Sequence, residues 1–382
     1  MFPYIFIILV LFIGAFVEIT IANKRNIKIL FIIESLLITL FVGLRFHTGA
    51  DWSAYEYAFY NMPSLGNYPH WEYGYYILNL ICYKLLGNYY VFQFLASCFV
   101  VYSASRFFWK HSEYPFSCLL LFFLTFIPNG ILMCQVRQSI AIGIIAFGAK
   151  YILNRSFIKF LIVVYIASLF HISSIAAIPL YLCTIKFPKS ILTIAVILSQ
   201  IFYFVPNLIA KFIKILIPIF PSRLAEIAQS YLDSVFFSGT VSFGTGLYYI
   251  FTVIIGIIII LFINRRNEAD NLYVNALVIS MIISAISNSF TILSRFEPIY
   301  LLFAVLSYTL IFNQKIKHIK RSVVPTIAIV MLSIFHYIPF NALITSTSIS
   351  KLTGRAENYG WTPYYNVILH PKEAEERLDW NE

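Results

Sequence analysis

The stretch PYIFIILVLFIGAFVEITIA at residues 3–22 contains a single charged side chain in twenty positions. Twenty residues of α-helix reach about 30 Å, which is the thickness of the hydrocarbon core of a bilayer. Similar runs recur along the chain, which has 382 residues and is 60% hydrophobic but only 12% charged. A soluble domain would be about 25% charged. The sequence therefore predicts an all-α polytopic membrane protein.

The apolar runs predict about 12 transmembrane helices, with a range of about 10–14. Two of the runs are short, and we expect them to form a hairpin that turns at His171. A single tilted helix would place its flanking lysines on opposite sides of the membrane, which the distribution of basic residues disfavours. The first run lacks the basic segment and the cleavage site of a signal peptide, so we expect it to be retained. The expected spans are 3–22, 28–46, 89–108, 115–133, 137–153, 158–170, 173–185, 188–206, 246–264, 272–290, 297–313 and 322–340.

Basic residues gather in the short gaps that we assign to the cytoplasm, as the positive-inside rule describes. Fifteen of the 27 lysines and arginines lie there, so membrane orientation explains the net charge of +10 and no nucleic-acid partner is expected. The orientations of the twelve expected spans are mutually consistent only if residues 73–86 lie along the membrane interface and do not cross the membrane. Both termini are then extracytoplasmic. The fifteen residues are Lys24, Arg25, Lys28, Arg106, Lys110, Arg155, Lys159, Lys186, Lys189, Arg265, Arg266, Lys315, Lys317, Lys320 and Arg321.

We expect one transmembrane domain over residues 1–340, followed by a polar extracytoplasmic tail at 341–382. Two long loops, at about 47–88 and 207–245, face the same side. The second alternates lysines with apolar residues, as an interfacial amphipathic helix does. The five cysteines lack the spacing of a metal site or a disulfide framework. Motifs for nucleotide or metal binding are also absent from the sequence, so no metal and no cofactor are expected.

Charged residues at membrane depth are the first candidates for function. Each costs roughly 2.5–3.5 kcal/mol, so one that remains there usually has a task. On the expected topology these residues gather at the extracytoplasmic face. Three of them, Arg45, Arg137 and Arg295, carry planar guanidinium groups that suit phosphate oxygens. We hypothesise that they bind a diphosphate headgroup. The alternative is that each arginine pairs with a nearby carboxylate as a structural contact.

A proton acceptor and a sugar-binding surface can be named in the same region. His171 stands in an apolar segment, and imidazole accepts a proton near neutral pH. Asp51 and Glu72 are the alternative bases, and a buried structural role is the alternative for His171. Aromatic faces suit sugar rings, although they also suit an interfacial belt. The candidates for sugar contact are Trp52, Tyr55, Gln138 and Tyr300.

Five short motifs occur in one order along the chain and resemble those of the EpsG family of bacterial exopolysaccharide proteins. The likeness runs from about residue 40 to 310, and the tail beyond 340 has no counterpart in it. The motifs are GLRFHTGADWSAY at 43–55, Glu-Tyr-Gly-Tyr at 72–75, Val-Arg-Gln-Ser-Ile-Ala at 136–141, Ala-Ser-Leu-Phe-His-Ile-Ser-Ser at 167–174, and Ser-Arg-Phe at 294–296 with Tyr300.

The resemblance implies a Wzy-type polymerase of O-antigen, capsule or exopolysaccharide repeat units. Such a protein is a metal-independent membrane glycosyltransferase of GT-C-like architecture. It is expected in the cytoplasmic (inner) membrane of a bacterium, with its active site facing the periplasm or exterior. Its donor and acceptor would be undecaprenyl-diphosphate-linked oligosaccharides. Besides the lipid bilayer, a chain-length regulator of the Wzz type and a flippase are the expected partners.

The resemblance also assigns roles to the residues already named. The family's arginines correspond to Arg45, Arg137 and Arg295, which would stabilise the departing diphosphate. His171 is the first choice for the base that accepts the proton of the acceptor hydroxyl, Asp51 the second and Glu72 the third.

Other functions remain open at this point. A lipid-linked oligosaccharide flippase would spread its charges through a central cavity and show a pseudo-repeat, and neither pattern is evident. A membrane O-acyltransferase could also use a lone histidine, but it would need access for an acyl donor from the cytoplasm. A ligase that moves finished glycan to another lipid shares the chemistry of the polymerase.

Overall fold

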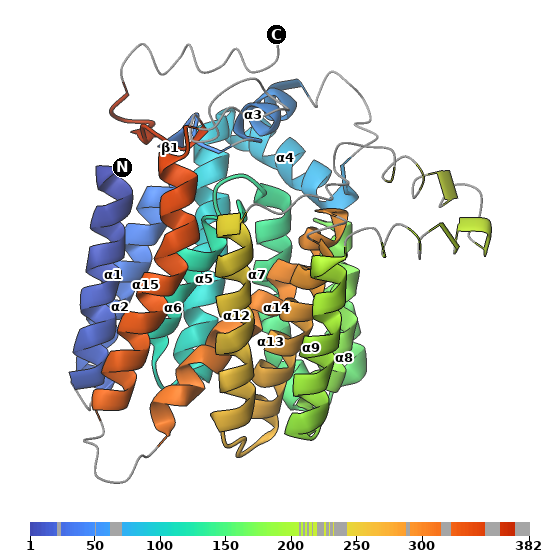
Figure 1. Ribbon diagram of the computed structural model, residues 1–382. Coiled ribbons are helices and arrows are strands. Elements are labelled where there is room, and N and C mark those ends of the chain that lie inside the picture. The colour runs from blue at the N-terminus through green and yellow to red at the C-terminus, as the bar shows by residue number, and fades with distance from the viewer. Residues whose placement is uncertain are drawn as a thin grey trace. The chain divides into compact units, whose positions relative to one another are not determined.

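The structure is a computed structural model that describes residues 1–20, 24–49, 51–61, 71–205, 243–287, 291–314, 322–347 and 360–370, with isolated positions between 208 and 232. The elements of this described part are nearly all helices (Figure 1), which confirms the all-α prediction. Five of them are long and apolar enough to cross a membrane, and shorter apolar helices accompany them. The number of spans therefore stays a prediction. The five are Phe2–Thr20, Tyr89–His111, Val136–Leu153, Glu268–Ser287 and Val323–Thr345.

The chain forms two compact units. Unit 1 is Met1–Ile175 with Lys315–Glu382, and unit 2 is Ala176–Gln314. The expected loop at 207–245 falls mostly outside the described residues. Unit 1 contains α1 (Phe2–Thr20), α2 (Lys24–Gly43), β1 (Arg45–Phe46), α3 (Trp52–Asn61), α4 (Tyr73–Leu86), α5 (Tyr89–His111), α6 (Pro115–Phe126), α7 (Val136–Leu153), α8 (Phe157–Ser168), α15 (Val323–Thr345) and β2 (Tyr365–Asn366). Unit 2 contains α9 (Lys189–Phe204), η2 (Ile217–Ile219), α12 (Phe243–Phe262), α13 (Glu268–Ser287), η3 (Thr291–Arg295), α14 (Glu297–Leu310) and η4 (Ile311–Asn313), while η1 (Ile172–Thr184) joins the units.

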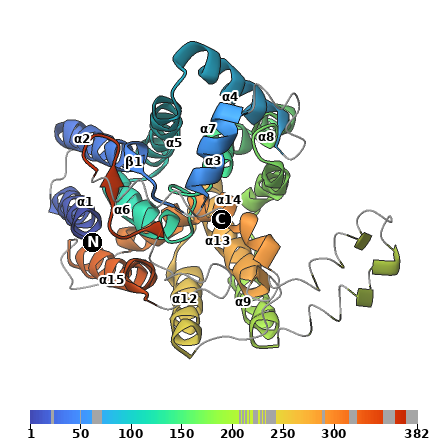
Figure 2. The same ribbon diagram turned by 90° about the horizontal axis from the view of Figure 1, so that it is seen from above.

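Helix α6 is the core of unit 1. All of its residues are buried, and α1, α2, α5 and α15 pack against it (Figure 2). Its first turn is capped from a distance, because the Glu18 carboxylate accepts hydrogen bonds from the N–H groups of Phe116 (3.0 Å) and Ser117 (3.1 Å). A carboxylate at a helix N-terminus satisfies free donors and complements the helix dipole. This contact explains the single charge in the opening apolar run.

The span expected at 115–133 is wrong in its second half. Helix α6 ends at Phe126, and residues 127–135 form turns with Gly130 at φ +71°. The sequence Pro128-Asn129-Gly130 is the reason, since proline cannot continue a helix and glycine readily adopts positive φ. Irregular backbone at membrane depth is tolerated only where protein surrounds it or it lines a cavity. The turns at 127–135 are therefore a place to look for a site.

The chain also leaves the helix expected at 28–46 early. Helix α2 ends at Gly43, and β1 pairs antiparallel with β2, so that Arg45 lies opposite Asn366 and Phe46 opposite Tyr365 (Figure 1). Part of the segment expected to form a polar tail thus lies against the first family motif. The Tyr4 hydroxyl donates to the Trp361 carbonyl oxygen at 2.9 Å, which fixes this segment to α1 as well.

A break at His171 is confirmed, since α8 ends at Ser168 and a separate helix, η1, begins at Ile172. The second helix is of the 3-10 type over 13 residues. At about 2.0 Å per residue it reaches roughly 26 Å, against about 20 Å for an α-helix of equal length. The larger rise per residue of the 3-10 helix explains how so short an apolar run can approach the thickness of a bilayer.

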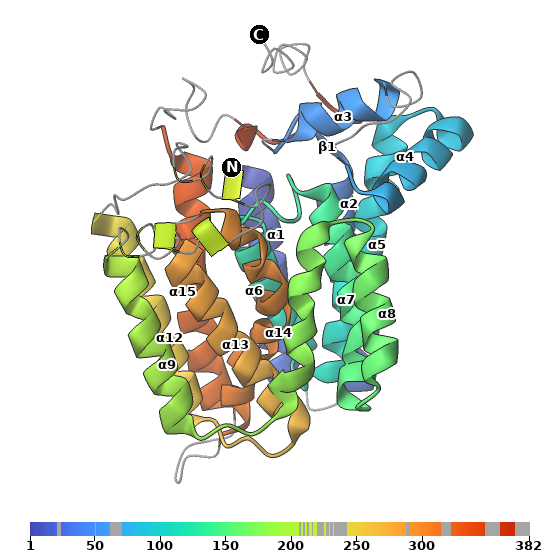
Figure 3. The ribbon, with the colours of Figure 1, turned by 90° about the vertical axis from the view of Figure 1, so that its right-hand side faces the viewer.

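Helices α3 and α4 lie at one end of unit 1, inclined to its long helices (Figure 3). Gly87, at φ +60°, ends α4, and Asn88 begins α5 by accepting hydrogen bonds from the N–H groups of Tyr90 and Val91. A left-handed glycine and an asparagine cap are the usual signals for such a corner. In unit 2, α13 packs against α9, α12 and α14.

Candidate functional site

The first family motif is held by close backbone contacts at one end of unit 1. Gly49 has φ +108°, and a Cβ atom there would lie 2.6 Å from the Met133 carbonyl oxygen. Its N–H donates to the Gly360 carbonyl oxygen at 2.8 Å. Only glycine suits a position with positive φ where another main-chain atom lies so close. The motif is thereby wedged between the turns after α6 and the C-terminal segment.

Gln93 of α5 fixes the same motif through its side-chain amide. The nitrogen donates to the carbonyl oxygens of Gly43 (2.8 Å) and Arg45 (2.9 Å), while the oxygen accepts from the Trp52 indole at 2.7 Å. Trp52 is only 2% exposed. The ring expected to contact sugar therefore serves in this structure to position the motif.

Arg45 lies inside the protein rather than on its surface. The residue is 1% exposed, and its Nη1 donates to the Val42 carbonyl oxygen at 2.6 Å. The Nε atom has no hydrogen-bond partner within the described residues, and none of the carboxylates described there forms a salt bridge with the group. An unpaired buried cation is costly, so this charge needs a functional explanation.

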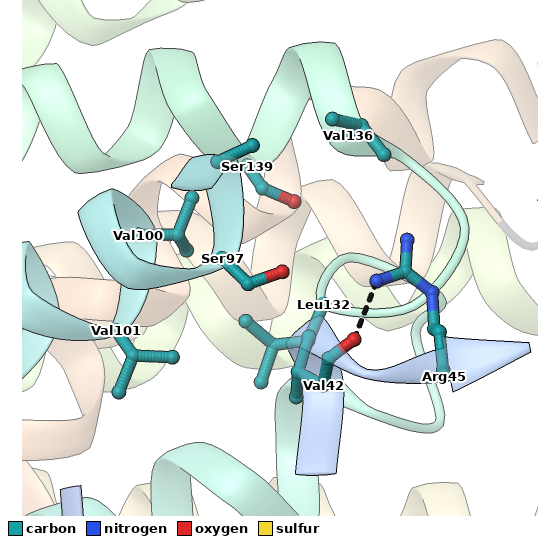
Figure 4. A pocket seen from close by; sticks show the side chains of 9 residues that line it. Val42, Arg45, Ser97, Val100, Val101, Leu132, Val136 and Ser139 are labelled. Carbon is teal, nitrogen blue, oxygen red and sulfur yellow. Dashed lines mark hydrogen bonds between the residues drawn. The ribbon is translucent and has the colours of Figure 1, made fainter. Parts of the chain in front are cut away.

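A small hollow lies beside the Arg45 guanidinium (Figure 4). Val42 of α2, Ser97 of α5 and Ser139 of α7 line it, together with Leu132 from the turns after α6. The turns after α6 therefore line a hollow. Its walls are mainly apolar, apart from Arg45 and the two serines.

Arg137, at the start of α7, is in a different setting. Its Nη1 donates to Oε2 of Glu72 at 2.6 Å, its Nε donates to the Tyr55 hydroxyl at 3.5 Å, and its guanidinium carbon lies 5.0 Å from the centre of the Trp71 ring. The side chains of Arg137 and Glu72 are 20% and 17% exposed. Of the five N–H donors of this arginine, two have a partner among the residues that the structure describes. Arg137 is fixed in place and still accessible.

Tyr55 completes this arrangement from α3. Burial raises the pKa of the Tyr55 hydroxyl, and the charge and hydrogen bond of Arg137 oppose the shift. The hydroxyl therefore keeps its proton around neutral pH and acts as a neutral partner of the guanidinium.

Glu72 connects Arg137 to the segment that carries His171. Its Oε1 accepts from the Ile172 N–H at 3.0 Å, and the Gly74 N–H donates to the Leu169 carbonyl oxygen at 2.8 Å. A Cβ at Gly74 would lie 2.8 Å from that oxygen. The Glu72 carboxylate does not cap α4, because its two oxygens accept hydrogen bonds from Arg137 and Ile172 instead. Three family motifs thus meet through one side chain.

His171 itself is 8% exposed and lies 2.6 Å from the Ser173 hydroxyl through its Nδ1 atom. The Ser173 N–H also points at Nδ1, at 3.3 Å. An N–H donor at Nδ1 needs the lone pair of that atom, so these contacts favour the neutral tautomer that carries its proton on Nε2. Ser173 is therefore placed to hold the ring.

The remaining predicted residues are Asp51 and Gln138 in unit 1 and Arg295 and Tyr300 in unit 2. Asp51 is exposed just before α3, where its main-chain oxygen accepts from the Tyr55 N–H at 3.2 Å, and Gln138 is buried next to Arg137. Arg295 is an exposed residue at the end of η3 in unit 2. Tyr300, also in unit 2, donates its hydroxyl proton to the Ala176 carbonyl oxygen at 2.5 Å. The roles assigned to these residues stay predictions.

Three residues of the site, Gln93, Ser97 and Ser139, were not found from the sequence, and neither was Tyr364, which packs on α2 behind it. Gln93 gave a signal, because an amide inside an apolar run needs partners. Tyr364 gave none. Its ring stacks on Phe41 at 4.5 Å between centres, and its hydroxyl donates to the Phe41 carbonyl oxygen at 2.6 Å. Over the described residues, no group of three histidine, cysteine or acidic side chains gathers that could hold a metal.

Comparison with known proteins gives one match. The sequence model of the EpsG family covers residues 28–365, which extends on both sides of the motifs quoted above and includes the strand β2 up to Tyr365. No curated protein and no solved structure matches the chain.

Proposed function

Because the chain belongs to the EpsG family, whose members are Wzy-type polymerase-like membrane proteins, we propose that it polymerises polysaccharide from lipid-linked repeat units. The donor is a glycan on undecaprenyl diphosphate, and the acceptor is a sugar hydroxyl of the next lipid-linked unit. The reaction takes place at the outer face of the cytoplasmic membrane of a bacterium.

The observation that supports this proposal most directly is that Arg137 is held in a fixed orientation and is still accessible. Its guanidinium is oriented by Glu72 and Tyr55, and its side chain is 20% exposed and so accessible to a ligand. In the reaction, the acceptor oxygen bonds to the anomeric carbon of the donor as the bond from that carbon to the diphosphate oxygen breaks. The electron pair of the broken bond goes to the diphosphate. A fixed cation stabilises this growing negative charge without reorganising.

The proton of the acceptor hydroxyl goes to a base, for which His171 is our first candidate. The fourth family motif supplies this imidazole, and Ser173 contacts its ring at Nδ1. Glu72 is less suited to this task, because both of its oxygens already accept hydrogen bonds from Arg137 and Ile172. We assign Glu72 to positioning and keep Asp51 as the second candidate for the base.

The two other arginines take different parts in the proposal. Arg45 is too deeply buried to reach a ligand directly, so we assign it an electrostatic role behind the site. We assign Arg295 as a further phosphate ligand, and this assignment depends only on its match to the last family motif.

Reconstitution tests the proposal. Purified protein in liposomes would receive a repeat unit on undecaprenyl diphosphate, with no nucleotide and no added metal, and the products would be separated on a gel. A ladder of glycan lengths is the expected result. Transfer of the intact unit across the bilayer without new glycosidic bonds would instead indicate a flippase. An unchanged substrate band with both readouts negative would also contradict the proposal.

A further inference from the structure

A second hollow, with both polar and apolar walls, lies between α5 and α7. Its lining includes Arg106, Lys110 and His111 from the last two turns of α5, and Lys150 from the last turn of α7. Arg137 opens α7 thirteen residues before Lys150, a separation of about 20 Å along a helix. The hollow is therefore at the end of these helices remote from the candidate functional site.

The hollow holds cations without matching anions. Among the described residues, Arg106, Lys110 and Lys150 form no salt bridge to a carboxylate. Arg106 lies over the Phe147 ring at 5.3 Å, and Lys150 lies over the Tyr151 ring at 4.6 Å. Arg106 and Lys110 are also four residues apart on one helix, an arrangement in which like charges repel. An anion in the hollow would remove this repulsion.

The donor set fits a phosphate group. A guanidinium offers a flat fork and the lysines offer mobile point charges, which together suit the oxygens of a phosphodiester. Phe107 and Phe147 add apolar wall to the same hollow. Lysines that merely orient a span need not converge from two helices on one cavity. Basic cavities between membrane helices are known to hold the headgroups of acidic lipids.

We propose that the hollow between α5 and α7 binds the phosphate of an anionic glycerophospholipid. The helices around it are membrane-spanning by length and composition, so acyl chains can lie along their sides. Free phosphate shares the headgroup chemistry but would gain nothing from the apolar wall. The proposal is independent of the polymerase activity, since none of its residues belongs to the site around Arg137.

Native mass spectrometry of the delipidated full-length protein provides the test. Phosphatidylglycerol, phosphatidylcholine and inorganic phosphate would be titrated separately against the unaltered protein and against Arg106→Gln/Lys150→Gln. The double variant should weaken phosphatidylglycerol binding about tenfold or more. A matched control, Lys159→Gln/Lys186→Gln, changes the charge by the same amount at exposed positions outside the hollow and should leave binding unchanged.

A second variant keeps the test independent of the first. Lys110→Glu places a carboxylate in the hollow and should abolish the selective binding of phosphatidylglycerol, while Lys159→Glu should not. Equal affinity of the unaltered protein for phosphatidylcholine, or equal binding by Arg106→Gln/Lys150→Gln and its control, would overturn the proposal. Equally tight binding of inorganic phosphate would overturn the assignment to a lipid.

Discussion

Arg45 and Arg137 belong to the first and the third motif of one family, yet their burial and their polar partners differ. Arg45 is fully buried, donates to a main-chain carbonyl and faces a mainly apolar hollow. Arg137 is one-fifth exposed and paired with Glu72. The first arrangement leaves a charge poorly compensated, whereas the second holds a compensated charge at the surface. We infer that Arg137 contacts the ligand directly and that Arg45 acts through its field.

The largest expected effect is that of Arg137→Ala. It should lower the rate of glycan polymerisation by roughly 10²–10³-fold, as loss of one preorganised donor to a developing anion does. Arg137→Lys should recover only part of the rate, because lysine lacks the fork that holds both Glu72 and a phosphate. The rate of ladder formation in liposomes is the measurement. Full activity of Arg137→Ala would show that the two arginines do not differ as we infer.

Glu72→Gln makes Arg137 more like Arg45 by removing its ionic partner. The amide oxygen can still accept from the guanidinium, but the amide nitrogen then faces the Ile172 N–H, so one of the two contacts of Glu72 is lost together with its charge. We expect an approximately tenfold lower rate, since a hydrogen bond between charged groups exceeds a neutral one by roughly 1 kcal/mol or more. A loss as large as the one measured for His171→Ala would instead assign Glu72 to the role of base.

Arg45→Met tests the other side of the comparison. Replacing a buried, unpaired charge by an apolar side chain of similar length is often neutral or stabilising by about 1–4 kcal/mol. Thermal stability in detergent should therefore hold or rise, while the rate falls by about fivefold through the loss of a Coulomb contribution. Lower stability with an unchanged rate would mean that Arg45 is a structural residue only.

The smallest effect is expected for Tyr364→Phe. The variant keeps the stacking on Phe41 and loses one hydrogen bond, which contributes about 0.5–1.5 kcal/mol to stability. A slightly lower melting temperature with a normal rate is the expected result. A rate reduced as far as that of Arg45→Met would place the C-terminal segment in the site rather than behind it.

The all-α class could be predicted from the sequence because the hydrophobic effect dominates, and it depends directly on the length and composition of the apolar runs. The sequence also predicted the break at His171. The break after Phe126 was not predicted, although Pro128-Asn129-Gly130 is a signal for it, because the apolar run continues past these residues. The pairing of β1 with β2 could not be predicted, since it joins residues more than 300 positions apart by main-chain bonds.

The arginines show the same limit of prediction from sequence. A motif indicates which residues matter but not whether a guanidinium is buried, as Arg45 is, or accessible, as Arg137 is. That distinction depends on the turns after α6 and on Gln93, which are tertiary features. The part of Arg295 stays a prediction from the family motif.

The most direct measurement is the affinity of the full-length protein for a short prenyl diphosphate, with the corresponding prenyl alcohol as control. The Lys110→Glu background keeps the hollow between α5 and α7 from contributing. Arg137→Ala should weaken diphosphate binding by about tenfold or more, leave the alcohol unaffected, and exceed the effect of Arg45→Met. Unchanged diphosphate affinity in Arg137→Ala would contradict the assignment of Arg137 as the phosphate ligand.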